Sequence, residues 1–447
     1  MSDFKLTDKQ QEIYDNIIED INEVQQGDIF AEHSFLSITG AAGTGKTFLS
    51  KSIVQTLMDK RMTVAVLAPT HQAVGVIKDS IDINNGNLHF ATLHAFMSLK
   101  PGDINPKTGE RKFKKTTGQK ASPLSKLKID IAIIDESSMI GDELYKFIKK
   151  EVFELNRIKA ILFLGDKFQL PAVEPENGSE IIHSVIYNNS MINHYELIDL
   201  IRNSDMEVIE FVTSIRKMIE GNGTKYDLFN YLVREKAKEH NKIVFYETKK
   251  DFIGNFIKTE RLGDTSDAIV TFTNAKVEEY NGKIRDYYIK KARGSLNEID
   301  NGDLFKVQSG DEDFMNSETL ELSSYIEKNF DFKGKTFKGY YCTTKDGRNF
   351  NYLSKDSVLD YERSCELLRL NAIKTKDRGA WLVYYELMEL FLEVKYHYAG
   401  TIHKSQGSSY ENIWIDCTNL GYVQDQMLLR LFYVAATRSK NKVHILI

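Results

Sequence analysis

A glycine-rich segment near the N-terminus has the residue types and the spacing of a phosphate-binding loop. The segment SITGAAGTGKTFLS, residues 37–50, fits the pattern G-x-x-x-x-G-K-[ST]. Backbone N–H groups of such a loop point at phosphate oxygens, its lysine neutralises the terminal phosphates, and its hydroxyl residue binds Mg²⁺. The pattern therefore predicts a site for ATP and Mg²⁺. Its candidate residues are Gly40, Ala41, Ala42, Gly43, Thr44, Gly45, Lys46 and Thr47, with Thr47 as a metal ligand.

Two acidic residues could supply the second metal ligand and the base that such a site needs. Asp135 and Glu136 follow the apolar run in KIDIAIIDESSM. We expect Asp135 to bind Mg²⁺ together with Thr47, and Glu136 to orient and deprotonate the attacking water. An Asp-Glu pair after a strand can also simply begin a loop, but the phosphate-binding pattern favours the catalytic interpretation.

Three further polar residues could complete the chemistry. Gln169 follows the apolar run in KAILFLGDKFQLPAV and is a candidate sensor of the γ-phosphate or the attacking water, although it could also be an ordinary loop residue. Arg202 in YELIDLIRNS and Arg438 in LFYVAATRSKNKV are candidate arginine fingers, because phosphoryl transfer needs positive charge at its transition state. If they belong to a second domain, turnover would be coupled to closure of a cleft.

Alternating strands and helices must bring these residues together. FLSIT has the pattern of a buried strand and KTFLSKSIVQTLMDK has helical spacing, which places the phosphates at a helix N-terminus. Residues 1 to about 198 alternate in this way, so we predict an α/β fold with a parallel sheet covered on both faces. The carboxyl ends of parallel strands meet at one edge, where ligands bind.

Composition excludes several classes of protein. The chain is 42% hydrophobic and 28% charged over 447 residues, which favours two to four globular domains. No apolar run approaches the roughly 20 residues of a membrane helix, and MSDFKLTDKQ lacks a signal-peptide core, so we expect a cytoplasmic protein without membrane contact. Cys342, Cys365 and Cys417 lie far apart, which argues against a zinc site or a disulfide framework.

The net charge of −5 predicts no strong bulk attraction to nucleic acid, so any such binding must use local patches. One basic segment could provide a patch, because eight lysines and arginines lie between Lys107 and Lys128 against Glu110 alone. Turn signals at residues 105–106 and 108–109 predict a hairpin within an insertion at 97–128, with Phe113 as the aromatic residue at its centre. A run of like charges is more often a solvated face than a binding site.

Ten short motifs, read in order, resemble those of the superfamily 1 helicases. They are LTDKQ, GAAGTGKT, APTHQAV, TLHAF, IIDESSM, GDKFQLPAV, LIRNS, VTFTNAKVEEYN, AGTIHKSQGSS and FYVAATR. They run from Leu6 to Arg438, so the resemblance covers essentially the whole chain. The chain most resembles the Dda-type helicases of T-even-like phages, in the 5′-to-3′ branch, with the RecD-type helicases next.

The resemblance implies roles for particular residues. Gln10 matches the glutamine that reads the adenine ring, with Gln11 as the alternative, and Gly407 matches a position at the nucleotide. Thr401, Lys404 and Gln406 could face either ATP or the nucleic acid. The residues implied to hold single-stranded nucleic acid are Pro69, Thr70, His71, Thr92, His94, Phe272, Thr273, Asn274, Thr401, His403 and Lys404. Hydroxyl and amide groups suit phosphate contacts, and aromatic or histidine rings suit base stacking.

The resemblance also implies a division into domains. It places a RecA-like core at 1–198, a second RecA-like core at 199–301 and 394–447, and an SH3-like insertion at 302–393. The hairpin in 97–128 would be a pin that splits the duplex, with Phe113 against the last base pair. Alternation within 302–393 predicts a small antiparallel barrel, followed by a helix from Trp381 to about Val394 in which Trp381 packs in a core rather than on bases.

The implied function is an ATP-dependent helicase that moves 5′ to 3′ on single-stranded DNA and unwinds duplexes from ss/dsDNA junctions. Composition and spacing do not decide between DNA and RNA or fix the direction. Two alternatives are an ATP-dependent switch that remodels protein–DNA complexes and the motor subunit of a helicase–nuclease. We expect a monomer, with a single-stranded DNA-binding protein or replication proteins as candidate partners.

Overall fold

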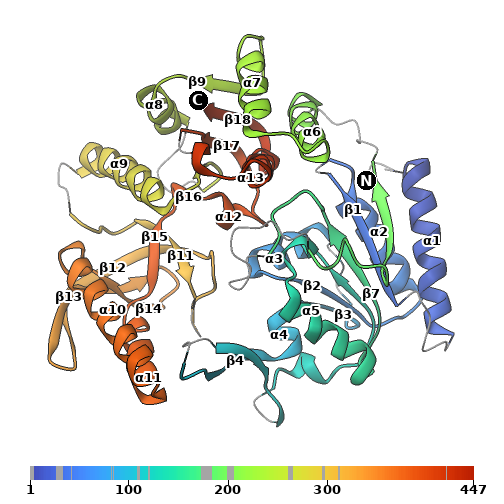
Figure 1. Cartoon of the computed structure of the whole chain (residues 1–447), viewed down its shortest axis with the longest axis horizontal. Coiled ribbons are helices and arrows are strands. Elements are labelled where there is room, and N and C mark those ends of the chain that lie inside the picture. Colours follow the sequence, from blue (N-terminus) through green and yellow to red (C-terminus); the bar gives the residue numbers. More distant parts are fainter. Residues whose placement is uncertain are drawn as a thin grey trace. The chain divides into compact units, whose positions relative to one another are not determined.

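A computed structural model describes most of the chain as two compact units (Figure 1). The described residues are 5–26, 34–41, 43–81, 83, 85–107, 111–118, 121–172, 184–198, 206–259, 265–293, 297–310, 313–418 and 420–447. The first unit comprises Met1–Ser98, Thr117–Thr248 and Ser405–Ile447, and the second comprises Leu99–Thr116 and Lys249–Lys404. No helix in the described ranges is both long and apolar enough to cross a membrane.

The first unit contains a six-stranded sheet in which every neighbouring pair of strands is parallel. Its strands, in sheet order, are β3 (Leu88–Thr92), β2 (Val64–Ala68), β6 (Ile129–Ile134), β7 (Ile158–Gly165), β1 (Phe35–Gly40) and β8 (Asn193–Leu197). The predicted parallel sheet is therefore confirmed. β1 and β2 are buried along their whole length, as expected for strands covered on both faces.

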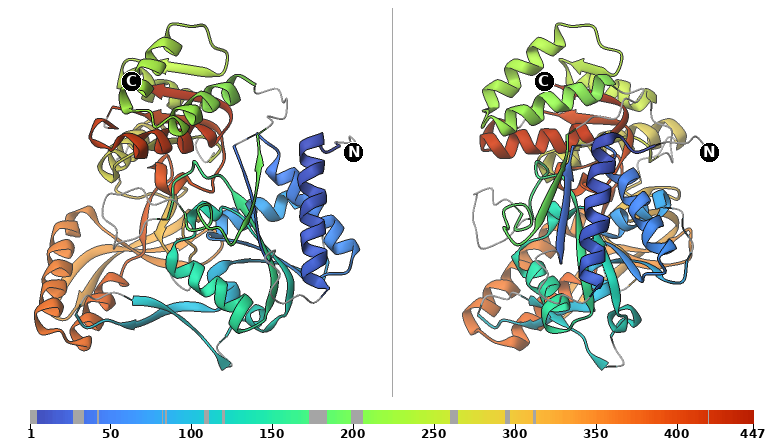
Figure 2. Two further views of the ribbon diagram at one scale, coloured as in Figure 1. Left: turned by 45° about the vertical axis from the view of Figure 1, so that its right-hand side comes forward. Right: turned by 90° about the vertical axis from the view of Figure 1, so that its right-hand side faces the viewer.

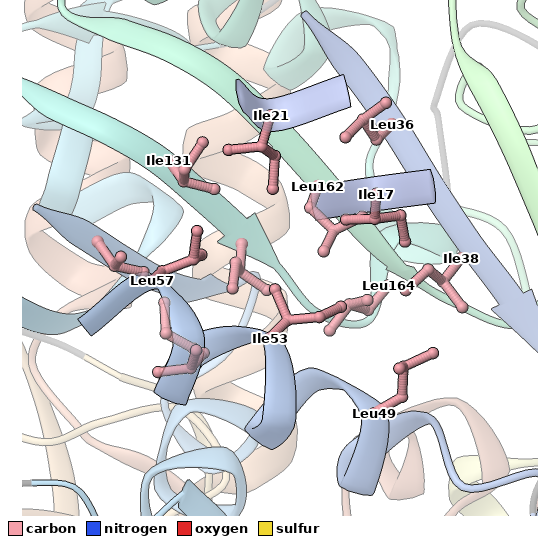
Figure 3. Packing of buried hydrophobic residues seen from close by; sticks show 14 of the residues in the cluster. Ile17, Ile21, Leu36, Ile38, Leu49, Ile53, Leu57, Ile131, Leu162 and Leu164 are labelled. Atoms are coloured by element: carbon pink, nitrogen blue, oxygen red, sulfur yellow. The ribbon is translucent and has the colours of Figure 1, made fainter. Parts of the chain in front are cut away.

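Helices on this sheet bury apolar residues that recur every three or four positions (Figure 3). They include α1 (Asp8–Gln25), α2 (Lys46–Asp59), α3 (His71–Ile81), α4 (Leu93–Met97) and α5 (Asp142–Lys149). Ile17 and Ile21 of α1 lie in one buried cluster with Ile53 and Leu57 of α2 and with side chains of β1 and β7. In Figure 2, α1 runs along this sheet. The core therefore fixes the start of α2, where the phosphate-binding loop ends.

The first unit also contains a second set of parallel strands. β9 (Ile243–Tyr246), β18 (Ser439–Leu446) and β17 (Tyr410–Asp416) pair in parallel, in that order. Three helices belong to the same part of the chain: α6 (Met206–Glu220), α7 (Lys225–Lys236) and α13 (Asp425–Thr437). Nine consecutive residues of α13, Leu428 to Ala436, are buried, and one of them is the charged Arg430.

The second unit combines a parallel strand pair with an antiparallel sheet. β10 (Ala268–Thr271) pairs in parallel with β16 (Ala399–Thr401), near α8 (Lys249–Thr259), α9 (Asn274–Arg293) and α12 (Ile402–Ser405). The antiparallel sheet consists of β14 (Asn349–Leu353), β13 (Lys335–Thr344), β12 (Thr319–Phe332), β11 (Leu304–Ser309) and β15 (Glu393–Tyr396). Its edges approach each other, because the Leu392 N–H donates to the Asn351 carbonyl at 2.9 Å. The predicted antiparallel insertion is thus confirmed.

The sequence predicts the end of one helix in the second unit too late, at about Val394. α11 (Arg378–Met388) begins after its cap Asp377 but stops six residues before Val394. Val394 instead lies in β15, opposite Val307 of β11. Strand pairing therefore overrides the helical spacing of the sequence there. A second helix, α10 (Val358–Thr375), packs against α11 and was not predicted.

A two-stranded hairpin interrupts the first unit's chain where the sequence predicted one. It consists of β4 (Leu99–Ile104) and β5 (Arg111–Lys115), with Pro101 opposite Phe113. The hairpin belongs to the second unit, in which Ile104 packs against Ala372 and Trp381. Trp381 is only 3% exposed, so it packs in a core as expected.

Candidate active site

The segment between β1 and α2 forms a tight turn whose shape depends on its glycines. Gly43 and Gly45 have φ values of 82° and 80°, a region that residues with a Cβ rarely adopt. A Cβ on Gly40 would lie 2.6 Å from Thr44 Oγ1, so that position also needs glycine. The turn opens directly into α2, which presents backbone N–H groups at its start. Ala42 lies outside the described residues.

Lys46 is held against this turn. Its Nζ donates to the carbonyl oxygens of Gly40 at 2.6 Å and Ala41 at 2.9 Å. Burial lowers the pKa of Lys46, and the nearby carboxylates, Asp166 first among them, oppose that shift. Thr47 follows at the second position of α2 and is exposed. An ammonium group within hydrogen-bonding reach of the loop is well placed for phosphate oxygens.

Gln10 contacts the same loop from α1. Its side-chain Nε2 donates to the Thr44 carbonyl at 3.1 Å, and its Oε1 accepts from the Thr7 N–H at 3.1 Å within a capping box. Gln10 is buried, whereas Gln11 is exposed and bonds to Asp15. Of the two glutamines that the sequence offered, Gln10 is therefore the one beside the phosphate-binding loop.

The acidic pair lies at the carboxyl end of β6. Burial, with the charge of Glu136 as the second cause, raises the pKa of Asp135 to about 6. Glu136 has a φ of 50°, an unusual backbone conformation for a residue with a side chain, and it caps the short helix Ser137–Met139. The two consecutive carboxyl groups therefore lie where the strand ends and this turn begins. Strained backbone of this kind is common at functional sites.

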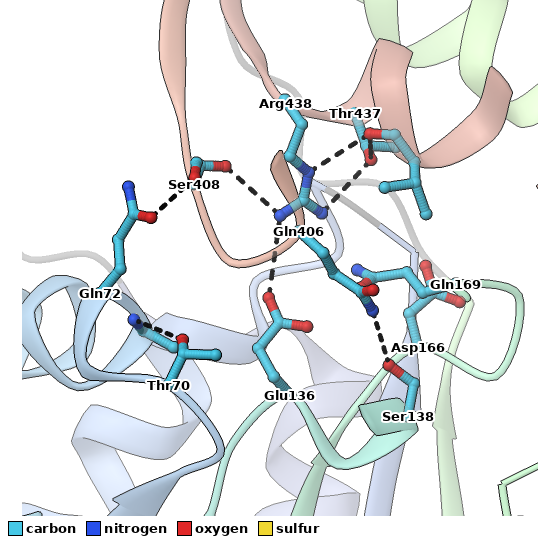
Figure 4. A network of polar contacts seen from close by, with 12 residues as sticks. Thr70, Gln72, Glu136, Ser138, Asp166, Gln169, Gln406, Ser408, Thr437 and Arg438 are labelled. Atoms are coloured by element: carbon cyan, nitrogen blue, oxygen red, sulfur yellow. Dashed lines mark hydrogen bonds and ion pairs between the residues drawn. The ribbon is translucent and has the colours of Figure 1, made fainter. Parts of the chain in front are cut away.

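Gln169 and Arg438 meet at Glu136 (Figure 4). Arg438 Nη1 lies 3.8 Å from Glu136 Oε1. With its amide oriented to suit these neighbours, Gln169 donates to Glu136 Oε2 at 3.0 Å and accepts from Arg438 Nη2 at 3.2 Å. The structure thus brings three predicted catalytic residues together, while Arg202 lies outside the described residues.

Two residues of α13 that the sequence reasoning missed hold the loop that carries Gln169. Arg430 Nη1 donates to the carbonyls of Lys167 at 2.8 Å and Gln169 at 3.0 Å. The Tyr433 hydroxyl donates to Asp166 Oδ2 at 2.5 Å. Arg430 could have been suspected from the sequence, because a charged residue interrupts the apolar run DQMLLRLFYVAAT.

The segment 406–408 joins these groups to α3. Gln406 Nε2 donates to the Leu170 carbonyl at 3.2 Å and to Ser138 Oγ at 3.3 Å, and the Ser408 hydroxyl donates to Gln72 Oε1 at 2.9 Å. Gly407 has a φ of 78°, and a Cβ there would lie 3.5 Å from Thr70 Oγ1. The structure therefore places Gly407, expected at the nucleotide, beside Thr70.

The other nucleic-acid candidates of the first unit lie at helix starts. The hydroxyls of Thr70 and Thr92 each accept a backbone N–H at 3.2 Å and so begin α3 and α4. His71 is exposed at the start of α3, whereas Pro69 and His94 are half-buried. Burial lowers the pKa of His94, which keeps its ring neutral near pH 7. An exposed histidine on a capped helix start can contact a strand.

The candidates of the second unit gather where β10 and β16 end. The rings of Phe272 and His403 lie 6.2 Å apart, and the Thr273 hydroxyl caps α9. Asn274 accepts from Lys395 at 3.2 Å. Lys404 donates to Gln308 Oε1 at 2.8 Å. Thr271 and Thr401 are opposite each other in the strand pair, so both segments reach one edge.

Parallel sheets with a phosphate-binding loop between a strand and a helix define a P-loop nucleotide hydrolase, and comparison with known proteins narrows that class. The AAA domain family matches residues 25–175, and the UvrD-like helicase C-terminal domain family matches residues 396–446.

Named relatives span almost the whole chain. The ATP-dependent DNA helicase dda of Enterobacteria phage T4 is 24% identical over 91% of this chain and 93% of its own. The ATP-dependent DNA helicase Pif1 of Campylobacter jejuni is 23% identical over 90% of this chain and 86% of its own. The fold is similar to that of a Bacteroides Pif1 helicase in complex with ADP-AlF3 and single-stranded DNA, with a TM-score of 0.54, 18% identity and coverage of 99% and 92%. The chain is thus similar to Pif1- and Dda-type helicases over almost its whole length.

Proposed function

We infer that this protein is an ATP-dependent DNA helicase, which binds single-stranded DNA and separates forked duplexes. One observation in the structure supports the inference beyond the similarity to these helicases. Arg438, which touches Glu136, also donates to the Ser408 carbonyl at 3.4 Å, and Ser408 bonds Gln72 of α3. A continuous set of contacts thus links the candidate hydrolytic carboxylate to the helix that begins at His71 (Figure 4).

The ATP site is proposed to work as follows. The loop from Gly40 to Thr47 and the Lys46 ammonium hold the phosphates. Gln10 contacts the adenine base of the nucleotide. Glu136 orients a water molecule and accepts its proton as the water oxygen bonds to the γ-phosphorus and the bond to the ADP oxygen breaks. Gln169 orients that water, and Arg438 stabilises the charge that develops on the γ-phosphoryl oxygens.

Mg²⁺ fits the residues at this site. The Thr47 hydroxyl and the Asp135 carboxylate offer the hard oxygen ligands that the ion prefers, and Asp135 follows directly from a buried strand that fixes its backbone. When bound, Mg²⁺ would neutralise charge on the β- and γ-phosphates. Burial of Asp135, which raises its pKa, disfavours an isolated carboxylate and so suits a cation partner.

Strand contacts and strand separation are assigned to different parts of the chain. Pro69, Thr70, His71, Thr92 and His94 hold the strand on the first unit, as do Phe272, Thr273, Asn274, Thr401, His403 and Lys404 on the second. The hairpin β4–β5 acts as the pin, with exposed Lys112 and Lys114 near phosphates and Phe113, 37% exposed, against the last base pair. Alternating grip, driven by ATP turnover, moves the protein 5′ to 3′ as a monomer.

Unwinding of matched duplexes with either a 5′ or a 3′ tail, made in DNA and in RNA, tests the proposal. We expect ATP-dependent unwinding of the 5′-tailed DNA and ATP turnover that rises when single-stranded DNA is added. Lys46→Ala should abolish both. A turnover rate that is indifferent to DNA would overturn the helicase assignment, while unwinding only from 3′ tails would overturn the direction alone.

The pin has its own test. Phe113→Ala should spare DNA-stimulated turnover and depress unwinding, and Phe113→Trp should restore it. If Phe113→Ala leaves unwinding unchanged, the wedge assignment is wrong. A wild-type protein that hydrolyses ATP on DNA but unwinds nothing would favour the switch that remodels protein–DNA complexes. Gel filtration with a single-stranded DNA-binding protein tests the monomer and partner assignments.

A further inference from the structure

A cavity of about 560 Å³ lies between α8 and α9 of the second unit, apart from every residue assigned above. Its volume falls within the range of roughly 300–1,000 Å³ that is usual for ligand pockets. α8 contributes residues three and four positions apart, which places them on one face of the helix. α9 contributes Lys283 and Tyr287, which are also four positions apart.

The floor of this cavity is aliphatic and open. Ile253 and Ile257 of α8 line it and are half-buried. Gly254 lies between them, and a Cβ at that position would meet no atom within 4 Å. Glycine weakens a helix interior by about 1 kcal/mol relative to alanine. A glycine that faces open space in this cavity therefore suggests that the space itself is needed. It leaves room for an apolar group from outside.

The rim is strongly basic. Lys249, Lys250, Lys258 and Lys283 line it. Lys249 and Lys283 share one carboxylate, Glu279, at 2.5 and 2.8 Å. Lys250 and Lys258 are exposed and have no carboxylate partner in the described ranges of the chain. Within the part of the chain that the structure describes, two positive charges therefore line an apolar site without a paired carboxylate, in a chain whose net charge is −5.

We propose that this cavity binds an acidic peptide segment of a partner protein, which inserts one apolar side chain between Ile253 and Ile257. Carboxylates of the peptide pair with Lys250 and Lys258. The charge of the rim requires an anionic partner. The pair Ile253 and Ile257 beside the open position at Gly254 favours insertion of an apolar side chain, and the ring of Tyr287, which also lines the cavity and is 43% exposed, can pack against that side chain.

Fluorescence anisotropy with three labelled probes tests the proposal on the full chain. The probes are the peptide DDEFDE, the matched peptide DDESDE, and a short oligothymidylate. We expect DDEFDE to bind and DDESDE to bind more weakly, because the serine cannot fill the floor. Combined Lys250→Glu and Lys258→Glu should weaken DDEFDE roughly tenfold or more. Gly254→Leu should weaken it similarly while keeping every charge.

Matched variants separate the cavity from general effects. Gly282→Leu adds the same group to α9 at a glycine that also faces open space but does not line the cavity, and it should leave binding unchanged. Lys338→Glu combined with Lys374→Glu removes two exposed lysines elsewhere in the second unit and should also be neutral. Thermal melting checks that each variant is folded.

Three results would overturn the proposal. The wild-type protein could fail to bind DDEFDE, or could bind it equally well after charge reversal at Lys250 and Lys258. If Gly254→Leu leaves the binding of DDEFDE unchanged, the peptide does not insert an apolar side chain at this position. If the charge reversal weakens the oligothymidylate but not the peptide, the cavity is part of a nucleic-acid surface.

Discussion

Arg438 Nη1 lies 3.8 Å from Glu136 Oε1, within the first unit of the fold. The arginine ends α13 and the glutamate follows β6, so their approach depends on the packing of the C-terminal segment and not on local sequence. Gln169 bonds to both side chains. In the proposed mechanism, an arginine in this position would contact the γ-phosphate that is attacked by the water molecule held by Glu136.

Arg438→Ala is therefore expected to lower the kcat of ATP hydrolysis by roughly a thousandfold with little change in KM, because an arginine finger acts mainly on the transition state. Arg438→Lys should be intermediate, since lysine keeps the charge but not the fork of donors. Steady-state assays with saturating DNA measure both constants. Arg234→Ala, at an exposed arginine of α7, is the control. A raised KM with normal kcat would instead assign Arg438 to ground-state binding.

Much of this site could be predicted because its residues follow buried strands. β1, β6 and β7 each end at a motif, and parallel pairing brings those ends to one edge regardless of sequence separation. Lys46, Glu136 and Gln169 are therefore recoverable from apolar runs and the polar residues that follow them. Strand ends do not predict the role of Arg430, which lies in a helix. Its partners are the backbone carbonyls of Lys167 and Gln169, and because every residue type has a carbonyl, the sequence does not identify them as partners.

The incorrect prediction that the helix from Trp381 continues to about Val394 has a different cause. From Trp381 onward the sequence has helical spacing, but the residues after Met388 gain more from strand pairing, in which Val394 lies opposite Val307. Propensity describes a segment alone, whereas the pairing depends on a strand far away along the chain. Contacts of that kind cannot be read from local periodicity.

Gly165, the last residue of β7, is expected to tolerate no larger side chain. A Cβ there would lie 2.3 Å from the Tyr187 hydroxyl and 2.7 Å from Ser137 Oγ. Gly165→Ala should lower the free energy of unfolding by about 1–3 kcal/mol, the usual cost of overpacking. Tyr187→Phe removes the nearer atom, so the same substitution should cost less in that background. Denaturant unfolding of the four proteins measures the difference, and equal costs would identify Ser137 as the decisive neighbour.

His444 should make the stability of the first unit depend on pH. Its ring stacks on Trp414 at 3.7 Å and its Nδ1 lies 3.0 Å from the Tyr246 hydroxyl. Burial, assisted by the charge of Lys442, lowers the pKa of His444 from 6.5 to about 4. Between these values only the unfolded chain binds the proton, so the free energy of unfolding decreases as pH falls from 6.5 to 4.

The loss should reach about 3 kcal/mol, the equivalent of this shift in pKa. Urea unfolding at several pH values measures it. His444→Phe keeps the stacking but cannot titrate, so its stability should fall less over the same interval. A variant with the same pH slope as the wild type would show that other groups cause the dependence.

We expect substitution of Trp381 to reduce DNA unwinding, because Trp381 contacts the hairpin β4–β5. Its Nε1 donates to the Pro106 carbonyl at 3.0 Å, and its ring packs against Ile104. Trp381→Phe keeps an aromatic ring but removes this hydrogen bond, a loss of about 1 kcal/mol, because water can reach the carbonyl of the exposed Pro106. Unwinding of forked DNA should fall several-fold while DNA-stimulated ATP turnover persists. Leu382→Ala, at the exposed neighbouring residue of α11, should change neither rate. A parallel fall of both rates in Trp381→Phe would mean that the tryptophan only stabilises the second unit, and the hairpin would lose its mechanical role.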